Sequence, residues 1–200
     1  MNYPKPIINL IECYKKLPGV GEKTAERMAL STLEMEQDLL DMFSNSILES
    51  KSKIRRCERC NNLSENSLCE ICTNKDRASK VLCVVEEPKN VFAFEKVGSY
   101  QGVYHVLDGL ISPLDGINPE DINIDSLVKR IKNEEIEEVI IAVRPSIEGE
   151  TTSLYILKKL EKLNVTVSKI AHGIPLGADM DYIDSMTLEM ALDDRKKISN

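Results

Sequence analysis

Residues 81–88 read Val-Leu-Cys-Val-Val-Glu-Glu-Pro, an apolar run that ends in two acids and a proline. A short apolar run without polar alternation is typical of a strand buried on both faces of a parallel sheet. Three later runs have the same character, at residues 103–107, 139–143 and 165–170. Segments with helical periodicity lie between them, at residues 89–97, 123–132 and 149–163. The alternation predicts an α/β domain with a mainly parallel sheet and flanking helices.

Acidic side chains follow two of these predicted strands. Glu86 comes directly after residues 81–85, and Glu148-Gly149-Glu150 follow residues 139–143. Parallel sheets bind ligands at the carboxyl ends of their strands, so we expect Glu86, Glu148 and Glu150 at one edge. Such a cluster could hold a weakly bound cation. Glu148 and Glu150 are equally well explained as first-turn acids that complement a helix dipole.

The sequence has six cysteines, and four of them form two Cys-x2-Cys pairs, Cys57/Cys60 and Cys69/Cys72. Each pair makes a tight turn that points two thiolates at one ion, and two pairs complete a tetrahedral zinc site. With four protein ligands, this Zn²⁺ has a structural role and no position for a reacting water. Disulfides or a redox pair are the alternatives. Cys13 and Cys83 lie in apolar stretches, and we expect both to be buried.

Residues 7–16 and 22–35 have helical periodicity and are joined by Leu-Pro-Gly-Val-Gly at residues 17–21. Glycines in such a turn permit positive φ and a close approach of the backbone to a ligand. Amide groups at a helix N-terminus bind phosphate, and lysine and arginine four residues apart add charge on one helical face. Five residues are predicted to contact DNA: Gly19, Val20, Gly21, Lys23 and Arg27. An ordinary packing hairpin or a dimer contact is the alternative. The core face of the second helix should carry Ala25, Met28, Ala29 and Leu33.

The net charge of −7 is unevenly distributed. Residues 1–79 are neutral, so the whole acidic excess lies in residues 80–200. Five basic residues, interrupted by a single glutamate, are candidates for a phosphate-binding patch or for a solvated face: Lys51, Lys53, Arg55, Arg56 and Arg59. No apolar run approaches the roughly 20 residues that span a bilayer, and residues 1–10 have no signal-peptide core. We therefore expect a cytoplasmic protein without a membrane partner.

The joined helices resemble the helix-hairpin-helix motif of DNA repair proteins, with its apolar residue followed by Pro-Gly-Val-Gly. The second half looks like a Toprim domain, which has a glutamate after its first strand and then Asp-x-Asp-x-Glu-Gly-Glu. Glu86 and residues 148–150 match this pattern, but Arg144 and Ser146 stand in the places of the two aspartates. The resemblance therefore implies a Toprim domain that has lost two metal ligands and gained a positive charge.

Helix-hairpin-helix, four-cysteine zinc finger and acid-depleted Toprim domain, in this order, resemble the RecR family of bacterial recombination mediators. Short stretches throughout the chain support this resemblance, among them residues 84–88, 104–107, 111–116 and 171–177. It implies a non-catalytic protein that binds single-stranded and duplex DNA without sequence preference. It also implies action with RecO and RecF to load RecA onto gaps coated by single-strand-binding protein, and assembly into homodimers or ring-like homotetramers.

The expected organisation has four parts: a helix-hairpin-helix region at 1–55, a zinc finger at 56–73, a Toprim domain at 80–175 and a helical tail at 176–200. The tail has helical periodicity between Ile183 and Ile198, and we expect it to pack on the sheet or on another subunit. His105 and His172 have no patterned partners and are interpreted as structural.

Two competing functions remain. A magnesium-dependent Toprim nuclease would cut DNA and lose that activity on Glu86→Gln. A zinc-containing adaptor that binds only proteins would show no affinity for DNA.

Overall fold

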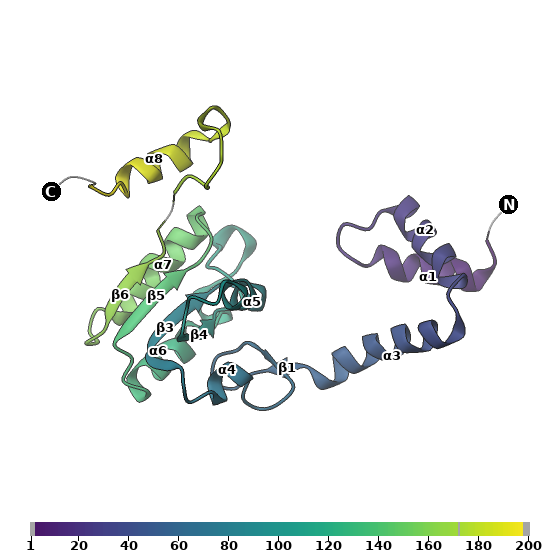
Figure 1. Cartoon of the computed structure of the whole chain (residues 1–200), viewed down its shortest axis with the longest axis horizontal. Coiled ribbons are helices and arrows are strands. Elements are labelled where there is room, and N and C mark those ends of the chain that lie inside the picture. The colour runs from purple at the N-terminus through teal and green to yellow at the C-terminus, as the bar shows by residue number, and fades with distance from the viewer. Residues whose placement is uncertain (1–2, 172, 198–200) are drawn as a thin grey trace. The chain divides into compact units, whose positions relative to one another are not determined.

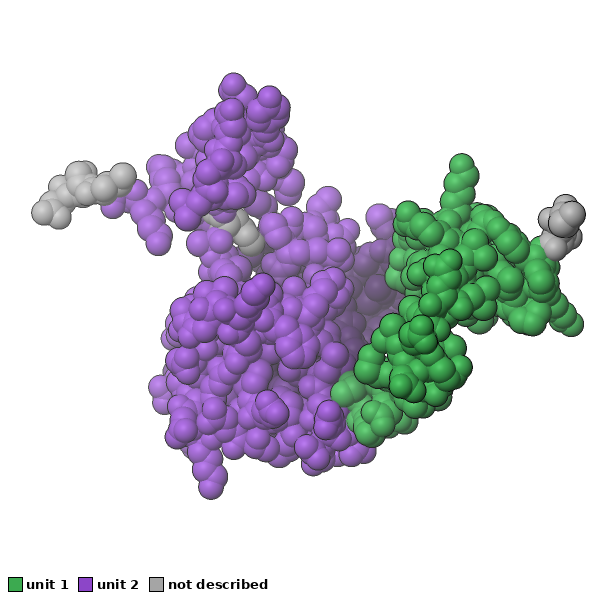
Figure 2. All heavy atoms as spheres, turned by 45° about the vertical axis from the view of Figure 1, so that its right-hand side comes forward, with its two compact units in different colours: residues 1–54 green, residues 55–200 purple. Residues whose placement is uncertain are grey.

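The computed structural model describes residues 3–171 and 173–197, and the chain divides into two compact units, residues 1–54 and 55–200 (Figure 2). His172 therefore lies outside the described residues, as does the end of the predicted tail. Each unit is described by itself below.

The first unit consists of three helices, α1 (Lys5–Lys15), α2 (Glu22–Leu33) and α3 (Gln37–Lys53). Ile11 of α1 packs against Ala25 and Ala29 of α2, and small alanine side chains allow the two helices to approach closely. The hydroxyl groups of Tyr14 and Thr32 are 2.7 Å apart and hydrogen-bonded. This pairing of α1 with α2 holds the intervening loop, residues 16–21, in a fixed conformation.

Two predictions for this unit are wrong. Thr32, not Leu33, continues the buried stripe of Ala25 and Ala29, and Leu33 is exposed. Cys13 is also exposed, because it stands two residues after Ile11 and a helix turns such a residue to the opposite face. Cys83, by contrast, is buried as predicted.

The second unit begins with the zinc finger and continues into the sheet domain (Figure 1). The finger comprises β1 (Arg55–Arg56), β2 (Leu63–Ser64) and the short α4 (Glu70–Thr73). The strands of the sheet domain are β3 (Ala78–Val85), β4 (Gly102–Val106), β5 (Glu138–Ala142) and β6 (Thr166–Lys169). Its helices are α5 (Pro88–Val97), α6 (Ile124–Asn133) and α7 (Ile147–Leu160). The strand order is β4-β3-β5-β6, and all three pairings are parallel, which confirms the predicted α/β fold.

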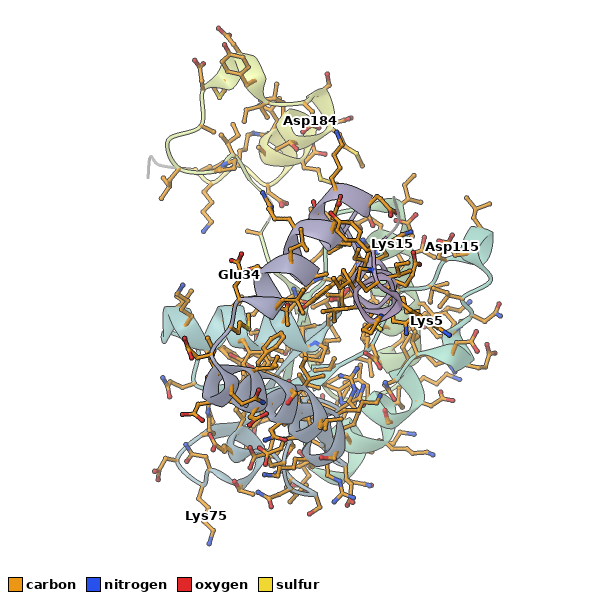
Figure 3. All side chains as sticks on the ribbon, turned by 90° about the vertical axis from the view of Figure 1, so that its right-hand side faces the viewer. Lys5, Lys15, Glu34, Lys75, Asp115 and Asp184 are labelled. Atoms are coloured by element: carbon orange, nitrogen blue, oxygen red, sulfur yellow. The ribbon has the colours of Figure 1, made fainter. Side chains whose placement is uncertain are left out.

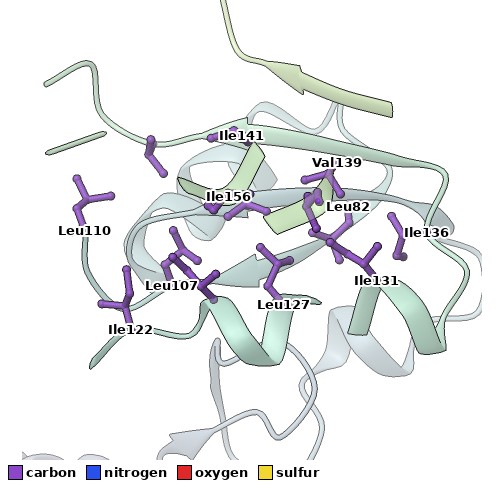
Figure 4. Packing of buried hydrophobic residues seen from close by; sticks show 14 of the residues in the cluster. Leu82, Leu107, Leu110, Ile122, Leu127, Ile131, Ile136, Val139, Ile141 and Ile156 are labelled. Carbon is purple, nitrogen blue, oxygen red and sulfur yellow. The ribbon is translucent and has the colours of Figure 1, made fainter. Parts of the chain in front are cut away.

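Helices cover both faces of this sheet. On one face, Leu82 and Val139 of the strands meet Leu127 of α6 and Ile156 of α7 (Figure 4). On the other face, Val85 and Tyr104 pack with residues of α5 and with Ile71 of α4. Successive residues of β3 alternate between the two clusters, as the period of a strand requires. The unbroken apolar run at 81–85 therefore follows from burial on both sides.

The remaining elements are three short 3-10 turns, η1 (Pro113–Asp115), η2 (Pro119–Asp121) and η3 (Met180–Tyr182), and the tail helix α8 (Ser185–Asp193). None of the described residues of α8 is buried, and Met186 and Leu192 are exposed. Within the described residues, α8 therefore does not bury a face against the sheet, and its packing on another subunit stays a prediction. Among the described residues, no helix is long and apolar enough to cross a membrane.

Candidate functional sites

The four predicted zinc ligands converge at one point. Cys57, Cys60, Cys69 and Cys72 are buried, and their sulfur atoms all lie within 4.8 Å of one another. A tetrahedron with Zn–S bonds of about 2.3 Å places its sulfurs roughly 3.8 Å apart, so one Zn²⁺ fits this group. The amide of Cys69 also donates to Cys57 Sγ at 3.3 Å, which ties the two cysteine pairs together.

The zinc finger is joined to the edge of the sheet by hydrogen bonds. The amide of Val106, in edge strand β4, donates to the carbonyl of Cys60 at 2.9 Å. The side-chain amide of Asn61 donates to the carbonyl of Val106 at 3.2 Å, and Asn61 adopts a φ of +62° to reach it. These bonds satisfy backbone groups that an edge strand otherwise leaves open. The finger therefore covers the carboxyl end of β4.

An arginine between two zinc ligands strengthens this junction. Arg59 donates two hydrogen bonds to the carboxylate of Glu134, at 2.7 Å and 2.8 Å, and a third to the carbonyl of Cys72 at 3.0 Å. Arg130 of α6 donates to the same carboxylate at 3.1 Å. Burial by itself would raise the pKa of Glu134, but the hydrogen bonds from Arg59 and the charge of Arg130 outweigh it and lower this pKa.

Three of the five residues in the predicted basic patch form ion pairs with carboxylates of the same chain. Arg59 pairs with Glu134, Arg56 with Asp108 at 2.6 Å, and Lys53 with Glu49 at 3.0 Å. The side chains of Lys51 and Arg55 remain exposed. Three of the five charges thus have carboxylate partners, and the choice between a phosphate-binding patch and a solvated face stays a prediction. The Lys53–Glu49 pair has the i,i+4 spacing of a helix, but no local pattern indicates the Arg59–Glu134 pair, whose members lie 75 residues apart.

The loop between α1 and α2 leaves its backbone open to a ligand. Gly19 has a φ of +78°, and Gly21 precedes α2 as its N-cap with no side-chain hydrogen bond. A Cβ atom added at either glycine would meet no atom of the described residues within 4 Å. Since no side chain caps the helix, the first amides of α2 are free to bind an anion. The hairpin therefore has the geometry that phosphate binding requires.

The charged residues around this hairpin support the same use. Lys23 and Arg27 are exposed, and they line a shallow depression on α2 together with Leu30, Ser31 and two acids, Glu26 and Glu34. Lys15, labelled in Figure 3, pairs with Glu22 at 2.6 Å and with Glu12 at 2.9 Å. Lys15 thus neutralises the one acidic side chain in the first turn of α2. Two cations next to an uncapped helix start suit a phosphate backbone.

The acidic residues follow the carboxyl ends of β3 and β5. Glu86 follows β3, and Glu148 and Glu150 lie in the first turn of α7. Ser146 is the N-cap of α7 and accepts a hydrogen bond from the amide of Gly149 at 3.2 Å. Gly149 is required here, because a Cβ atom would clash with the carbonyl oxygen of Arg144. The Glu-Gly-Glu sequence thus allows residues 144–146 to lie against the helix.

Each of these acids has a partner within the chain. Glu86 Oε1 lies 3.2 Å from Arg144 Nη2, and Glu150 forms an ion pair with Lys169. Glu148 accepts a hydrogen bond from Ser146 Oγ at 2.7 Å, which lowers the pKa of Glu148. Burial raises the pKa of Glu86, and the charge of Arg144 opposes that rise. Among the described residues, the three glutamates do not form a group placed to share one metal ion.

His105 has a structural role, as predicted. It is buried in β4, and its Nε2 lies 2.9 Å from the carbonyl oxygen of Asn123. A carbonyl only accepts, so we infer that Nε2 carries the hydrogen and that Nδ1 is unprotonated. Burial lowers the pKa of His105 to about 4. The histidine is therefore neutral near pH 7.

Comparison with known proteins identifies the family. Four family models match consecutive parts of the chain: RecR helix-hairpin-helix at residues 7–50, RecR four-cysteine zinc finger domain at 54–74, Toprim domain at 80–171 and RecR C-terminal at 173–196. The Recombination protein RecR of Enterococcus faecalis is 45% identical over 198 residues, which cover 99% of this chain and all of that protein. The chain belongs to the RecR family. The RecR of Staphylococcus aureus strain Newman is 44% identical over the same length.

RecR membership confirms the zinc prediction, because the zinc-finger model of this family covers all four converging cysteines. The RecR models also place a helix-hairpin-helix over α1, α2 and most of α3. The Toprim model covers the sheet and its three helices.

Proposed function

We propose that this RecR-family chain is a non-catalytic, DNA-binding recombination mediator in DNA repair. It acts in the cytoplasm with RecO and RecF to load RecA onto gapped single-stranded DNA coated by single-strand-binding protein. The observation that carries the DNA-binding part is the open hairpin at Gly19 and Gly21, followed by the exposed cations Lys23 and Arg27. The family relationship over 99% of the chain supports the mediator role.

DNA contacts of this kind involve the phosphate backbone. The amides of Gly19 and Gly21, those of the first turn of α2, and the charges of Lys23 and Arg27 reach phosphate oxygens, which are the same in every sequence. We therefore expect binding to single-stranded and duplex DNA without sequence preference. Val20 is half-buried, packs with the α1–α2 core and donates its amide to the carbonyl of Leu17 at 3.2 Å, so its proposed contribution is to hold the loop in shape for the neighbouring amides.

Assembly into homodimers or ring-like homotetramers is part of the proposal. No residue of α3 is buried, and this helix exposes large apolar side chains including Met42, Ile47 and Leu48. The tail likewise exposes Leu176, Tyr182 and Leu192. Contiguous exposed apolar side chains are typical of protein interfaces, and here they lie near both ends of the chain. A second copy of the chain is the occupant that we propose for both.

DNA affinity as a function of salt tests the hairpin assignment. We expect the Lys23→Ala/Arg27→Ala chain to bind DNA at least about tenfold more weakly at low salt, with a salt slope lower by about 2. The matched control is Lys158→Ala/Lys162→Ala, which removes the same charge from exposed positions at the end of α7. Equal affinity of the hairpin variant and the control would refute the assignment. Stimulation of RecA filament formation on coated single strands, with RecO and RecF present, tests the mediator role.

A Toprim nuclease is the competing function, and the Toprim match with three glutamates after strand ends favours it. The partners of these glutamates argue against it, since Arg144 holds Glu86 and Lys169 holds Glu150. A hard divalent cation prefers several free oxygen ligands. Magnesium-dependent DNA cleavage that is lost on Glu86→Gln would establish the nuclease and overturn the non-catalytic assignment.

A further inference from the structure

Arg144 lies where the Toprim pattern has its first aspartate, and its position is fixed by the fold. Its carbonyl oxygen packs so closely on Gly149 that only a residue without Cβ fits there. The same carbonyl accepts the amide of Ser146 at 3.0 Å. The backbone at residue 144 is therefore held against the first turn of α7, next to the carboxyl end of β3.

From this fixed backbone, the guanidinium reaches the least exposed acid of the cluster. Arg144 Nη2 is 3.2 Å from Glu86 Oε1, and the side chain of Glu86 is only 12% exposed. A carboxylate with so little contact with water needs a positive partner or must take up a proton. The side chain of Arg144 is 61% exposed, so most of the desolvation falls on Glu86. Arg144 supplies the positive charge that Glu86 requires.

The divalent cation that the Toprim fold implies does not fit the residues present. Mg²⁺ needs near-octahedral oxygen ligation. Here Arg144, a positively charged side chain, stands at the first aspartate position. Ser146 stands at the second, and its hydroxyl group is already hydrogen-bonded to Gly149 and Glu148. Lys169 engages the last glutamate of the pattern. The donor set thus lacks ligands and includes two positive charges.

We infer that the guanidinium of Arg144 takes the place of the divalent cation in this Toprim domain, and that its contact with Glu86 keeps such cations away from the glutamates that remain of the pattern. Arginine cannot lose its charge in a protein, so this exclusion is permanent. The acids of the pattern are still present, since Glu86 directly follows β3 and Glu148 and Glu150 lie in the first turn of α7. Among the described residues they have partners within the chain and do not share one ion site. Aspartates at 144 and 146 would then restore a cation site. Aspartate is also a good N-cap, so position 146 tolerates it without loss of α7.

Mn²⁺ binding to the full-length, zinc-loaded chain tests this inference. The signal of free Mn²⁺ in electron paramagnetic resonance would be measured during titration of the natural chain, Arg144→Asp and Arg144→Asp/Ser146→Asp. We expect at least about tenfold tighter binding by the double variant than by the natural chain, because a repulsive charge is replaced by two ligands. Arg144→Gln, which removes only the repulsion, should show a smaller gain and serves as a second variant if an aspartate chain folds poorly.

Two controls make the result specific. Lys162→Asp makes the charge change of Arg144→Asp at an exposed residue beyond α7 and should leave Mn²⁺ binding unchanged. Adding Glu86→Gln to the double variant should abolish the gain. The inference is overturned if the natural chain binds Mn²⁺ as tightly as the double variant, or if neither Arg144→Gln nor the double variant gains affinity. Because no DNA is present, this outcome is independent of the mediator proposal.

Discussion

Arg59 and Glu134 join the zinc finger to the sheet domain through a two-pronged ion pair, with Nε–Oε1 and Nη2–Oε2 distances of 2.7 Å and 2.8 Å. Arg59 stands between two zinc ligands, and Glu134 directly follows α6. Since Arg59 lies between the two ligands of the first cysteine pair and also donates to the carbonyl of Cys72 in the second, this residue links both pairs to the neighbouring domain. The finger is thus an integral part of the sheet domain.

Glu134→Gln should destabilise the second unit by about 1–3 kcal/mol, because it leaves the partly buried charges of Arg59 and Arg130 without their carboxylate. Zinc should also be lost to a chelator faster than from the natural chain. Urea denaturation and chelator competition measure the two effects. Glu135→Gln is the matched control, since its side chain is 86% exposed and forms a surface ion pair with Lys80. The control should change stability by less than about 0.5 kcal/mol. Equal stability of both variants would contradict this role of Arg59 and Glu134.

Removal of zinc should uncover edge strand β4. Without the metal the four thiolates no longer hold the finger together, and the carbonyl of Cys60 no longer holds the amide of Val106. Amide hydrogen exchange at Val106 should accelerate by about tenfold or more after chelation. The amide of Val84, in the central strand β3, is the internal reference and should change much less. Cys60→Ser should reproduce the effect or fail to fold. Unchanged exchange at Val106 in the metal-free chain would show that the finger does not protect this edge.

His105 should make the protein less stable as the medium becomes acidic. Its pKa falls from 6.5 in the unfolded chain to about 4 in the folded one, so its stabilising contribution is complete above about pH 6.5 and is lost as the pH falls toward 4. Protonation would place a charge on Nδ1, which has no partner among the described residues, with Arg130 as a nearby cation. Between about pH 7 and pH 5 the loss should reach about 2 kcal/mol.

Urea denaturation of the natural chain and of His105→Gln over this pH range isolates the effect of His105, because the two proteins share every other titratable group. Staying above about pH 5 also limits protonation of the zinc-binding thiolates. The difference in unfolding free energy between the two proteins should shrink steadily toward low pH. A constant difference would mean that the pKa of His105 is the same in the folded and the unfolded chain.

The sequence predicted most of the fold because local patterns determine it. Apolar runs in β3 and β5 mark strands buried on two faces, and the spacing of the four cysteines gives the metal site without knowledge of the rest of the chain. The Arg59–Glu134 pair and the Arg56–Asp108 pair could not be predicted, because each joins residues more than 50 positions apart with no pattern between them. The presence of Arg144 was visible in the sequence, but its contact with Glu86 required the geometry of two adjacent strands.

Gly21→Ala should separate the fold of the hairpin from its contact with DNA. Gly21 has a φ of −84°, which any residue adopts, and a Cβ atom there would meet nothing within 4 Å among the described residues. Alanine caps a helix less well than glycine, but it also restricts the unfolded chain, and the two effects oppose each other. The unfolding free energy should therefore change by less than about 0.5 kcal/mol. A methyl group on this surface would nevertheless keep a phosphate from the first amides of α2, and DNA affinity should fall by about tenfold. Gly19→Ala is the contrasting variant, because its φ of +78° should cost about 1 kcal/mol of stability. If Gly21→Ala bound DNA as tightly as the natural chain, phosphate would not approach the backbone at this position.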